Sequence, residues 1–196
     1  MLLDAQDSQL LLIDYQQRLM PAIAGHDAVL ANARRLAQAA AALDVPLWAT
    51  EQNPAGMGPT VDELRGLVGQ PLPKTSFSAA GVVLPRLRPS TRPAGNARSL
   101  PRHLQKPAAP TRETIVMAGC ETHVCVLQTA LELVEEELEV WVVTDACGSR
   151  TDRNRDAAFD RLAGAGVELV TTEMVIFEWL RGADHPRFKE ALAWVK

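Results

Sequence analysis

Two spacing patterns alternate along the chain: short apolar runs typical of buried strands, and longer stretches with apolar residues three and four positions apart. The runs that predict strands are 9–14, 45–50, a short one ending near Lys74, 114–118, 139–144 and 167–170. The stretches that predict helices are 27–43, 122–137, 152–165, 173–181 and 186–195. Strands apolar on both faces and separated by helices are typical of a parallel sheet covered on both sides. The sequence therefore predicts an α/β fold, a three-layer α-β-α sandwich with a largely parallel, Rossmann-like central sheet, as one domain over 1–196.

One stretch, 85–112, breaks this alternation. It contains six prolines, which disfavour regular helix and central strand, so it predicts a long surface loop. It also carries six arginines and one lysine but no acid, and the rest of the chain has 13 basic against 24 acidic residues. The net charge of −4 therefore hides an acidic body with a basic insert. Because the insert lacks aromatic residues for base stacking, a solvated loop is favoured over a nucleic-acid partner.

The cysteines and the apolar runs bound the compartment. Cys120, Cys125 and Cys147 are an odd number without the spacing of a disulfide framework, which predicts reduced thiols. The first residues are acidic where a signal peptide would be basic, and no apolar run approaches the roughly 18 residues of a membrane span. We expect a cytoplasmic protein with no membrane partner.

Three chemically active side chains stand at predicted strand ends. In a parallel sheet the carboxyl ends of the strands line one crevice, and Asp14, Lys74 and Cys125 follow three different strands. Cys125 lies in the first turn of a helix, where the backbone N–H groups and a nearby lysine favour the thiolate. Asp14 is placed to accept the thiol proton and return it to a leaving group. Together they predict covalent catalysis, with an oxyanion held by backbone N–H groups of 121–125.

Each of these residues also has a structural interpretation. A buried cysteine most often packs as a small hydrophobe, Asp14 could cap a loop and Lys74 could be a surface lysine. Cys120, five residues before Cys125, is the second candidate nucleophile, because it precedes the helix that supplies the dipole. We expect Cys147 to pack under the next loop.

Six motifs resemble those of one known family in their order along the chain and in their local sequence. They are the segments 11–16, 50–60, 74–78, 119–126, 144–150 and 171–178. Over the whole chain except 85–112, the sequence resembles the isochorismatase-like cysteine hydrolases, a superfamily that includes nicotinamidases and N-carbamoylsarcosine amidases. Within it, the chain is most similar to the branch of isochorismatase domain-containing proteins.

The resemblance implies a role for each candidate. It makes Cys125 the nucleophile, Asp14 the proton shuttle and Lys74 the cation that favours the thiolate. It also implies a cis peptide between Cys120 and Glu121, which turns the N–H groups of Glu121 and Cys125 into an oxyanion hole. The candidates for the substrate-binding pocket wall are Gln16, Gln52, Phe77 and Thr172.

Departures from the family narrow the chemistry. Nicotinamidases bind a metal through an Asp-x-His pair after the second strand, whereas this chain has Glu51, Gln52 and Asn53 there, so we expect no metal and no other cofactor. Isochorismatases of siderophore pathways lack the cysteine, so Cys125 argues against vinyl-ether hydrolysis. A thiolate suits an amide, carbamoyl or ester carbonyl, with C–N bonds favoured, through a thioester intermediate.

Two further interpretations concern partners. The alternative to an enzyme is a non-catalytic oligomeric scaffold, or a small-molecule binding protein of the same fold. Related proteins form dimers, tetramers or octamers, so we expect a homo-oligomer. Trp179 and Trp194, expected to be exposed on the last helices, are candidate contact residues. His123 is expected at the pocket rim or at a subunit contact, since residues two apart on a helix face different ways.

Overall fold

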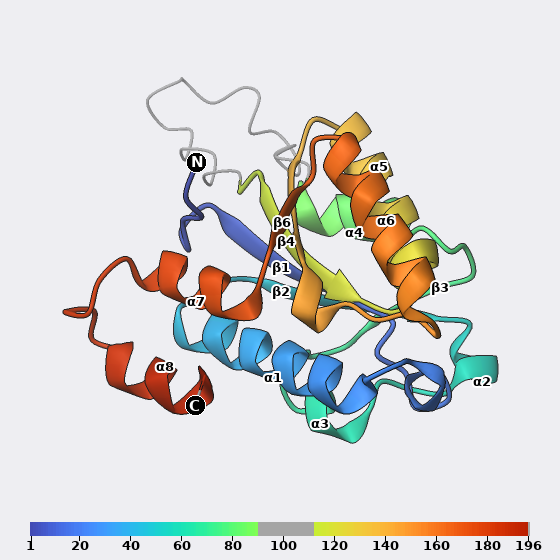
Figure 1. Ribbon diagram of the computed structural model, residues 1–196, viewed down its shortest axis with the longest axis horizontal. Coiled ribbons are helices and arrows are strands. Elements are labelled where there is room, and N and C mark those ends of the chain that lie inside the picture. The colour runs from blue at the N-terminus through green and yellow to red at the C-terminus, as the bar shows by residue number, and fades with distance from the viewer. Residues whose placement is uncertain (90–111, 196) are drawn as a thin grey trace, which may run out of the picture.

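A computed structural model describes residues 1–89 and 112–195 (Figure 1). Its six strands form one sheet in the order β3-β2-β1-β4-β5-β6, and every neighbouring pair is parallel. The strands are β1 (Ser8–Ile13), β2 (Leu47–Gln52), β3 (Leu72–Lys74), β4 (Thr114–Gly119), β5 (Glu139–Val143) and β6 (Glu168–Val170). The predicted parallel sheet is confirmed.

Helices cover both faces of the sheet (Figure 1). One face is covered by α4 (Ala80–Leu87), α5 (Leu127–Glu135) and α6 (Asp152–Gly164). The other carries α1 (His26–Ala42), α7 (Thr172–Leu180) and α8 (Phe188–Val195), where α1 contacts both α7 and α8. Short helical segments complete the described chain: η1 (Met20–Ala22), α2 (Pro54–Met57), α3 (Asp62–Arg65), η4 (Thr122–Val126) and η5 (Thr144–Ala146). The three-layer architecture is therefore confirmed, and no helix of the described residues is long and apolar enough to cross a bilayer.

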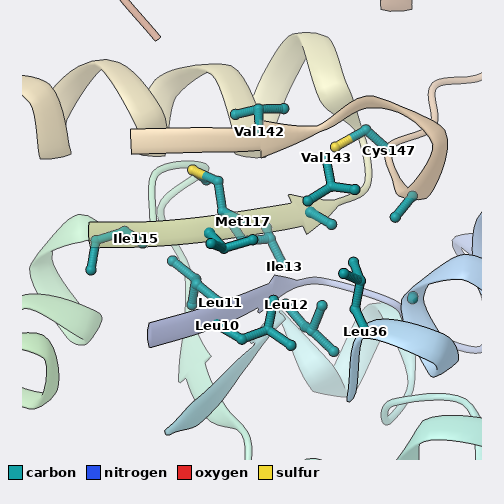
Figure 2. Packing of buried hydrophobic residues seen from close by; sticks show 14 of the residues in the cluster. Leu10, Leu11, Leu12, Ile13, Leu36, Ile115, Met117, Val142, Val143 and Cys147 are labelled. Atoms are coloured by element: carbon teal, nitrogen blue, oxygen red, sulfur yellow. The ribbon is translucent and has the colours of Figure 1, made fainter. Parts of the chain in front are cut away.

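The core lies on the central strands. All six residues of β1 and all six of β4 are buried. Figure 2 shows Leu11, Met117 and Val142, which are partners in register on the neighbouring strands β1, β4 and β5 and are all buried. Each fully buried side chain of this size contributes about 1.5–3 kcal/mol. The central strands therefore give a rigid base to the residues that follow their carboxyl ends.

The predicted loop at 85–112 begins later than the sequence suggested. Helix α4 continues through Pro85 to Leu87, because Val83 and Leu87 are buried against the core and this packing outweighs the missing proline N–H. Residues 90–111 lie outside the described structure. The described ends of the stretch meet at Gln9, whose Nε2 donates to the carbonyls of Leu87 and Arg112 at 3.0 and 2.9 Å. Gln9 lies near the amino end of β1, so these ends are far along the sheet from Asp14.

The expectation for the tryptophans is wrong. Trp179 is only 3% exposed, because α7 packs onto the sheet and its Nε1 donates to Ser8 Oγ at 3.0 Å. Trp194 is half-buried, and its carbonyl accepts a hydrogen bond from Arg35 Nε on α1. Both residues therefore hold the terminal helices against this chain rather than present a free surface.

Gly119 is required by a close approach of β1 and β4, directly before the candidate site. A Cβ at this position would collide with the carbonyl oxygen of Ile13 and lie 2.6 Å from the Ile13 Cβ. We expect Gly119→Ala to lower the free energy of unfolding by about 1–3 kcal/mol, because buried backbone must move. Denaturant unfolding measures this.

The matched control is Gly164→Ala, in α6, where an added Cβ meets nothing within 4 Å. Since alanine stabilises helices relative to glycine by about 0.5–1 kcal/mol, this variant is expected to be as stable as the parent or slightly more so. Equal stability of the two variants would contradict the close approach.

Candidate active site

A buried ion pair links the ends of two strands. Asp14 follows β1 and Lys74 ends β3, and both side chains are fully buried. Lys74 Nζ lies 2.6 Å from Asp14 Oδ2, and Thr50 Oγ1 donates to Asp14 Oδ1 at 2.7 Å. Lys74 also donates to the carbonyls of Phe77 at 2.9 Å and Ser76 at 3.2 Å. The three donors of the ammonium are thus all used, and the orientation of the carboxylate is fixed.

Cys125 lies beside this ion pair, on the helical turn that follows β4. It belongs to η4, a π-helical turn between β4 and α5, and it is 6% exposed. The peptide bond between Cys120 and Glu121, directly before this turn, is cis, as the resemblance implies. Cys125 and Asp14 both line one cavity of about 310 Å³ at the carboxyl edge of the sheet. The complete lining is Asp14, Gln16, Leu19, Gln52, Met57, Phe77, Glu121, Val124, Cys125 and Arg150.

The protonation of Cys125 differs from expectation. The pKa of its thiol is raised to about 12: burial is the largest cause, the Asp14 carboxylate also raises it, and the Lys74 ammonium lowers it. The loss of solvation, which the sequence does not reveal, outweighs the lysine and the helix N-terminus that favour the thiolate. Because Lys74 is neutralised by Asp14, its effect does not offset burial. At neutral pH Cys125 is therefore a thiol, and it needs a base to react.

This assignment predicts the pH dependence of alkylation. Only the thiolate attacks iodoacetamide, and with a pKa of about 12 its fraction rises about tenfold per pH unit throughout the alkaline range. We expect the rate of Cys125 alkylation to keep rising to about pH 10, where a free thiol with a pKa of about 8.5 has already levelled off. Intact-mass kinetics with glutathione as reference thiol measure both. A rate that levels off near neutral pH would contradict the thiol assignment.

The other two cysteines lie outside the cavity. Cys120 is fully buried, and burial raises the pKa of its thiol well above the ordinary value. Cys147 lies in the loop after β5 and is buried, and burial raises the pKa of its thiol to about 12 (Figure 2). Of the three thiols, Cys125 is the one that lines the cavity.

Three of the four predicted pocket-wall residues line the cavity. Gln16 is committed to the protein: its Nε2 donates to the carbonyls of Gln52 and Gly58, and its Oε1 accepts from the Gln52 N–H. The Gln52 side chain donates weakly to the Thr75 carbonyl at 3.3 Å. Phe77 is 55% exposed and lies at the cavity mouth. Gln16 therefore shapes the wall, and Gln52 and Phe77 are free to contact a ligand.

Thr172 differs from its prediction. It lies at the start of α7, outside the cavity lining. Its N–H and its Oγ1 both donate to Asp145 Oδ1, at 2.8 and 2.9 Å. Proximity to a strand end suggested a pocket residue, but the hydroxyl is used to tie α7 to the loop after β5.

Arg150 and the side chain of Glu121 are wall residues that sequence reasoning missed. The Glu121 carboxylate accepts hydrogen bonds from the Arg150 backbone N–H at 2.9 Å, from Nε at 3.1 Å and from Nη2 at 2.7 Å. These bonds hold the pKa of the Glu121 carboxyl below its ordinary value. No local pattern signals the pair, because the two residues are 29 positions apart. Leu19, Met57 and Val124 add an apolar wall.

Neither histidine chemistry nor a metal site is found among these residues. His123 Nδ1 lies 3.0 Å from Ser149 Oγ, and the histidine does not line the cavity. Within the described residues, no group of three histidine, cysteine, aspartate or glutamate side chains could hold a metal ion.

Comparison with known sequences identifies one family. The isochorismatase domain matches residues 8–174. Isochorismatase domain-containing protein 2A from Mus musculus is 36% identical over 191 residues, which cover 97% of this chain and 84% of that protein.

Solved structures of similar fold agree. MAR1 ribonuclease from Caenorhabditis elegans superposes with a TM-score of 0.83 at 31% identity, covering 100% of this chain and 92% of that one. YcaC from Pseudomonas aeruginosa, solved with hexane-2,5-diol and covalent acrylamide, superposes with a TM-score of 0.80 at 26% identity. The match covers 98% of this chain and 91% of that one. YcaC from Escherichia coli, an octameric hydrolase of unknown specificity, superposes with a TM-score of 0.77 at 26% identity. The match covers 99% of this chain and 87% of that one. The match over most of the chain, in sequence and in fold, shows that this protein belongs to the isochorismatase family and has its hydrolase fold.

Proposed function

We propose that the protein is a cofactor-independent cysteine hydrolase that cleaves a small, uncharged amide, carbamoyl or ester compound, with C–N bonds favoured. One observation carries this proposal: a cysteine thiol and a buried carboxylate line the same cavity, and the carboxylate is fixed by a lysine that has no other free donor. A thiol with a raised pKa is a poor nucleophile by itself, and Asp14 supplies the base it needs.

The reaction takes two steps. Cys125 Sγ attacks the carbonyl carbon while Asp14 accepts the thiol proton, and the carbonyl electron pair moves onto oxygen. Asp14 then protonates the leaving nitrogen or oxygen as its bond to carbon breaks, which leaves a thioester on Cys125. Water attacks the thioester while Asp14 accepts one of its protons, the C–S bond breaks to release the acid, and Asp14 returns that proton to sulfur to restore the thiol. Lys74 holds the Asp14 side chain in place throughout.

Backbone N–H groups are suited to stabilise the oxyanion of both steps. Among the described residues, the Glu121 N–H donates to no protein acceptor, and the Cys125 N–H donates to none outside its own helical turn. Both flank the cavity wall that carries Sγ. We assign the oxyanion hole to these two donors, each worth on the order of 10²–10³ in kcat in enzymes of this type.

The charges of the cavity favour an uncharged substrate. Its charged wall residues are Asp14, which pairs with Lys74, and Glu121 and Arg150, which pair with each other. The remaining wall is largely apolar. A charged ligand would therefore lose its hydration in the cavity without gaining a free opposite charge to pair with. The volume of about 310 Å³ lies at the lower end of ligand pockets, which favours a small molecule.

Two of the similar structures bear on this proposal. Acrylamide is an electrophile that alkylates thiols, so the covalent acrylamide in Pseudomonas YcaC supports a reactive nucleophile in this fold. The octameric state of Escherichia coli YcaC supports our proposal that this chain also forms a homo-oligomer. The ribonuclease from Caenorhabditis elegans suggests RNA instead, but a phosphodiester needs unpaired cations at the site, and the two cations beside the cavity in the described part of the chain, Lys74 and Arg150, are both paired.

A substrate panel tests the proposal. It contains short neutral amides, N-carbamoyl compounds and p-nitrophenyl esters, each with a carboxylate-bearing counterpart, and single-stranded RNA. We expect hydrolysis of at least one neutral class, weaker hydrolysis of its charged counterpart and none of RNA. No turnover of any neutral compound would favour the alternative, a scaffold or small-molecule binding protein of the same fold.

A further inference from the structure

Both the backbone and the side chain of Glu121 bear on the site. Its N–H is a proposed oxyanion donor, and its carboxylate, 8% exposed, accepts three hydrogen bonds from Arg150. Arg150 comes from the loop after β5, whereas Glu121 follows β4. The pair therefore ties the catalytic turn to a separate part of the chain.

The geometry of the pair is that of a rigid clamp. Nε binds one carboxylate oxygen and Nη2 the other, which is the two-pronged arrangement that fixes both partners in direction. The Arg150 backbone N–H donates to Glu121 Oε2, the oxygen that also accepts from Nε. The clamp is therefore also anchored by the main chain. In contrast, Arg155 on α6 pairs with Asp152 and Asp156, which are both largely exposed.

The backbone around the clamp is held as well. Gly148 N–H donates to the Gly119 carbonyl at 3.2 Å, and the Gly148 carbonyl accepts from Thr122 N–H at 2.8 Å. Residues 148–150 thus contact the chain immediately before and after the Cys120–Glu121 bond. Between these two backbone contacts, Arg150 holds the Glu121 side chain through its carboxylate.

We propose that Arg150 is a positioning residue: by clamping the Glu121 carboxylate, it fixes the direction of the Glu121 N–H toward the carbonyl oxygen. This inference rests on the proposed function. With the clamp removed, the donor misaligns by a fraction of its hydrogen-bond length, which is sufficient to lose much of its effect on the oxyanion. The side chain of Arg150 is 64% exposed, so its net contribution to stability as an ion pair is small.

Two probes separate this role from other defects. Butyraldehyde adds reversibly to a thiol: a C–S bond forms, the thiol proton passes to Asp14, and the carbonyl electron pair moves to an oxygen that occupies the oxyanion hole. Iodoacetamide alkylates the same thiol by displacing iodide and forms no oxyanion. Succinic semialdehyde has the same four-carbon chain as butyraldehyde but carries a carboxylate, so it reports direct binding of a substrate anion by Arg150.

The experiment measures, at alkaline pH and by intact mass, how each aldehyde protects Cys125 against iodoacetamide. The variants are Arg150→Ala, Arg150→Lys, and Arg150→Ala combined with Glu121→Gln, with Arg155→Ala as the surface-pair control. We expect Arg150→Ala to weaken butyraldehyde binding about tenfold to a hundredfold. Arg150→Lys, which keeps the charge without the fork, is expected to lose about as much, and Arg155→Ala to match the parent.

The double variant removes both charges, so it separates position from charge. If the clamp acts by position, binding of butyraldehyde stays weak in the double variant; recovery to the parent value would overturn the inference. It would also be overturned if Arg150→Ala weakened succinic semialdehyde alone, because Arg150 would then bind substrate directly. If butyraldehyde gave no protection in the parent protein, the proposed function itself would fail. Circular dichroism checks folding, and Arg150→Lys decides the matter should the alanine variant unfold.

Discussion

Cys125→Ala is expected to abolish hydrolysis of whichever panel compound the parent protein cleaves, with kcat reduced by a factor on the order of 10³ or more. The reason is that no second thiol lines the cavity within the described residues, so no side chain can take over the attack. Steady-state kinetics on the compound with the highest turnover measure the loss. The alanine variant is expected to fold, because the substitution removes a single buried sulfur atom, which costs only modest stability.

Cys120→Ala and Cys147→Ala are the matched controls. Both residues are buried thiols of the same size at the same end of the sheet, yet neither lines the cavity. Each variant is expected to keep kcat within a few-fold of the parent, with a modest loss of stability from the vacated volume. Activity that survived in Cys125→Ala and disappeared in Cys120→Ala would transfer the nucleophile to Cys120.

Asp14→Asn is expected to change hydrolysis and alkylation in opposite directions. Hydrolysis should fall by a factor on the order of 10² or more, because the amide cannot accept the thiol proton. Alkylation of Cys125 should become faster at a given pH: the carboxylate that raises the thiol pKa is gone, while the Lys74 ammonium that lowers it remains. Parallel assays of turnover and of iodoacetamide labelling on one preparation measure both.

The same substitution has a stability cost that must be controlled. Breaking a fully buried ion pair leaves Lys74 without its counter-charge, at a cost of about 3–5 kcal/mol. Thr50→Val is the control, since it removes one hydrogen bond to Asp14 and leaves the charges intact. It is expected to retain most of the hydrolytic activity, and its Cys125 is expected to be alkylated at a rate close to that of the parent. Slower labelling in Asp14→Asn than in the parent would contradict the electrostatic assignment.

The positions of the strand ends could be predicted from the sequence because they follow from periodicity. Buried apolar runs separated by helices specify a parallel sheet, and the sheet edge brings Asp14 and Lys74 together from positions 60 apart. The boundary error at Pro85 arose where packing of Val83 and Leu87 outweighed a local helix breaker. Local rules predict elements well wherever burial and backbone preference agree.

The remaining features depend on long-range contacts that leave no local pattern. The Arg150–Glu121 clamp joins two loops, and neither residue has a spacing that signals the other. The protonation of Cys125 depends on how fully the fold removes it from water, which the sequence does not specify. Thr172 shows the converse: a polar residue at a strand end is used internally, by Asp145.

The central claim is that a thioester forms on Cys125, and mapping the acylated residue tests it most directly. Brief reaction with p-nitrophenyl butyrate, an acid quench and cleavage after glutamate place the three cysteines on separate peptides, 114–121, 122–132 and 140–168. We expect the butyryl group on 122–132, which holds Cys125. In Asp14→Asn, where acylation is slower, we expect less of this butyrylated peptide. Butyrylation confined to 114–121, or p-nitrophenol released with no acyl group on 122–132, would contradict the account.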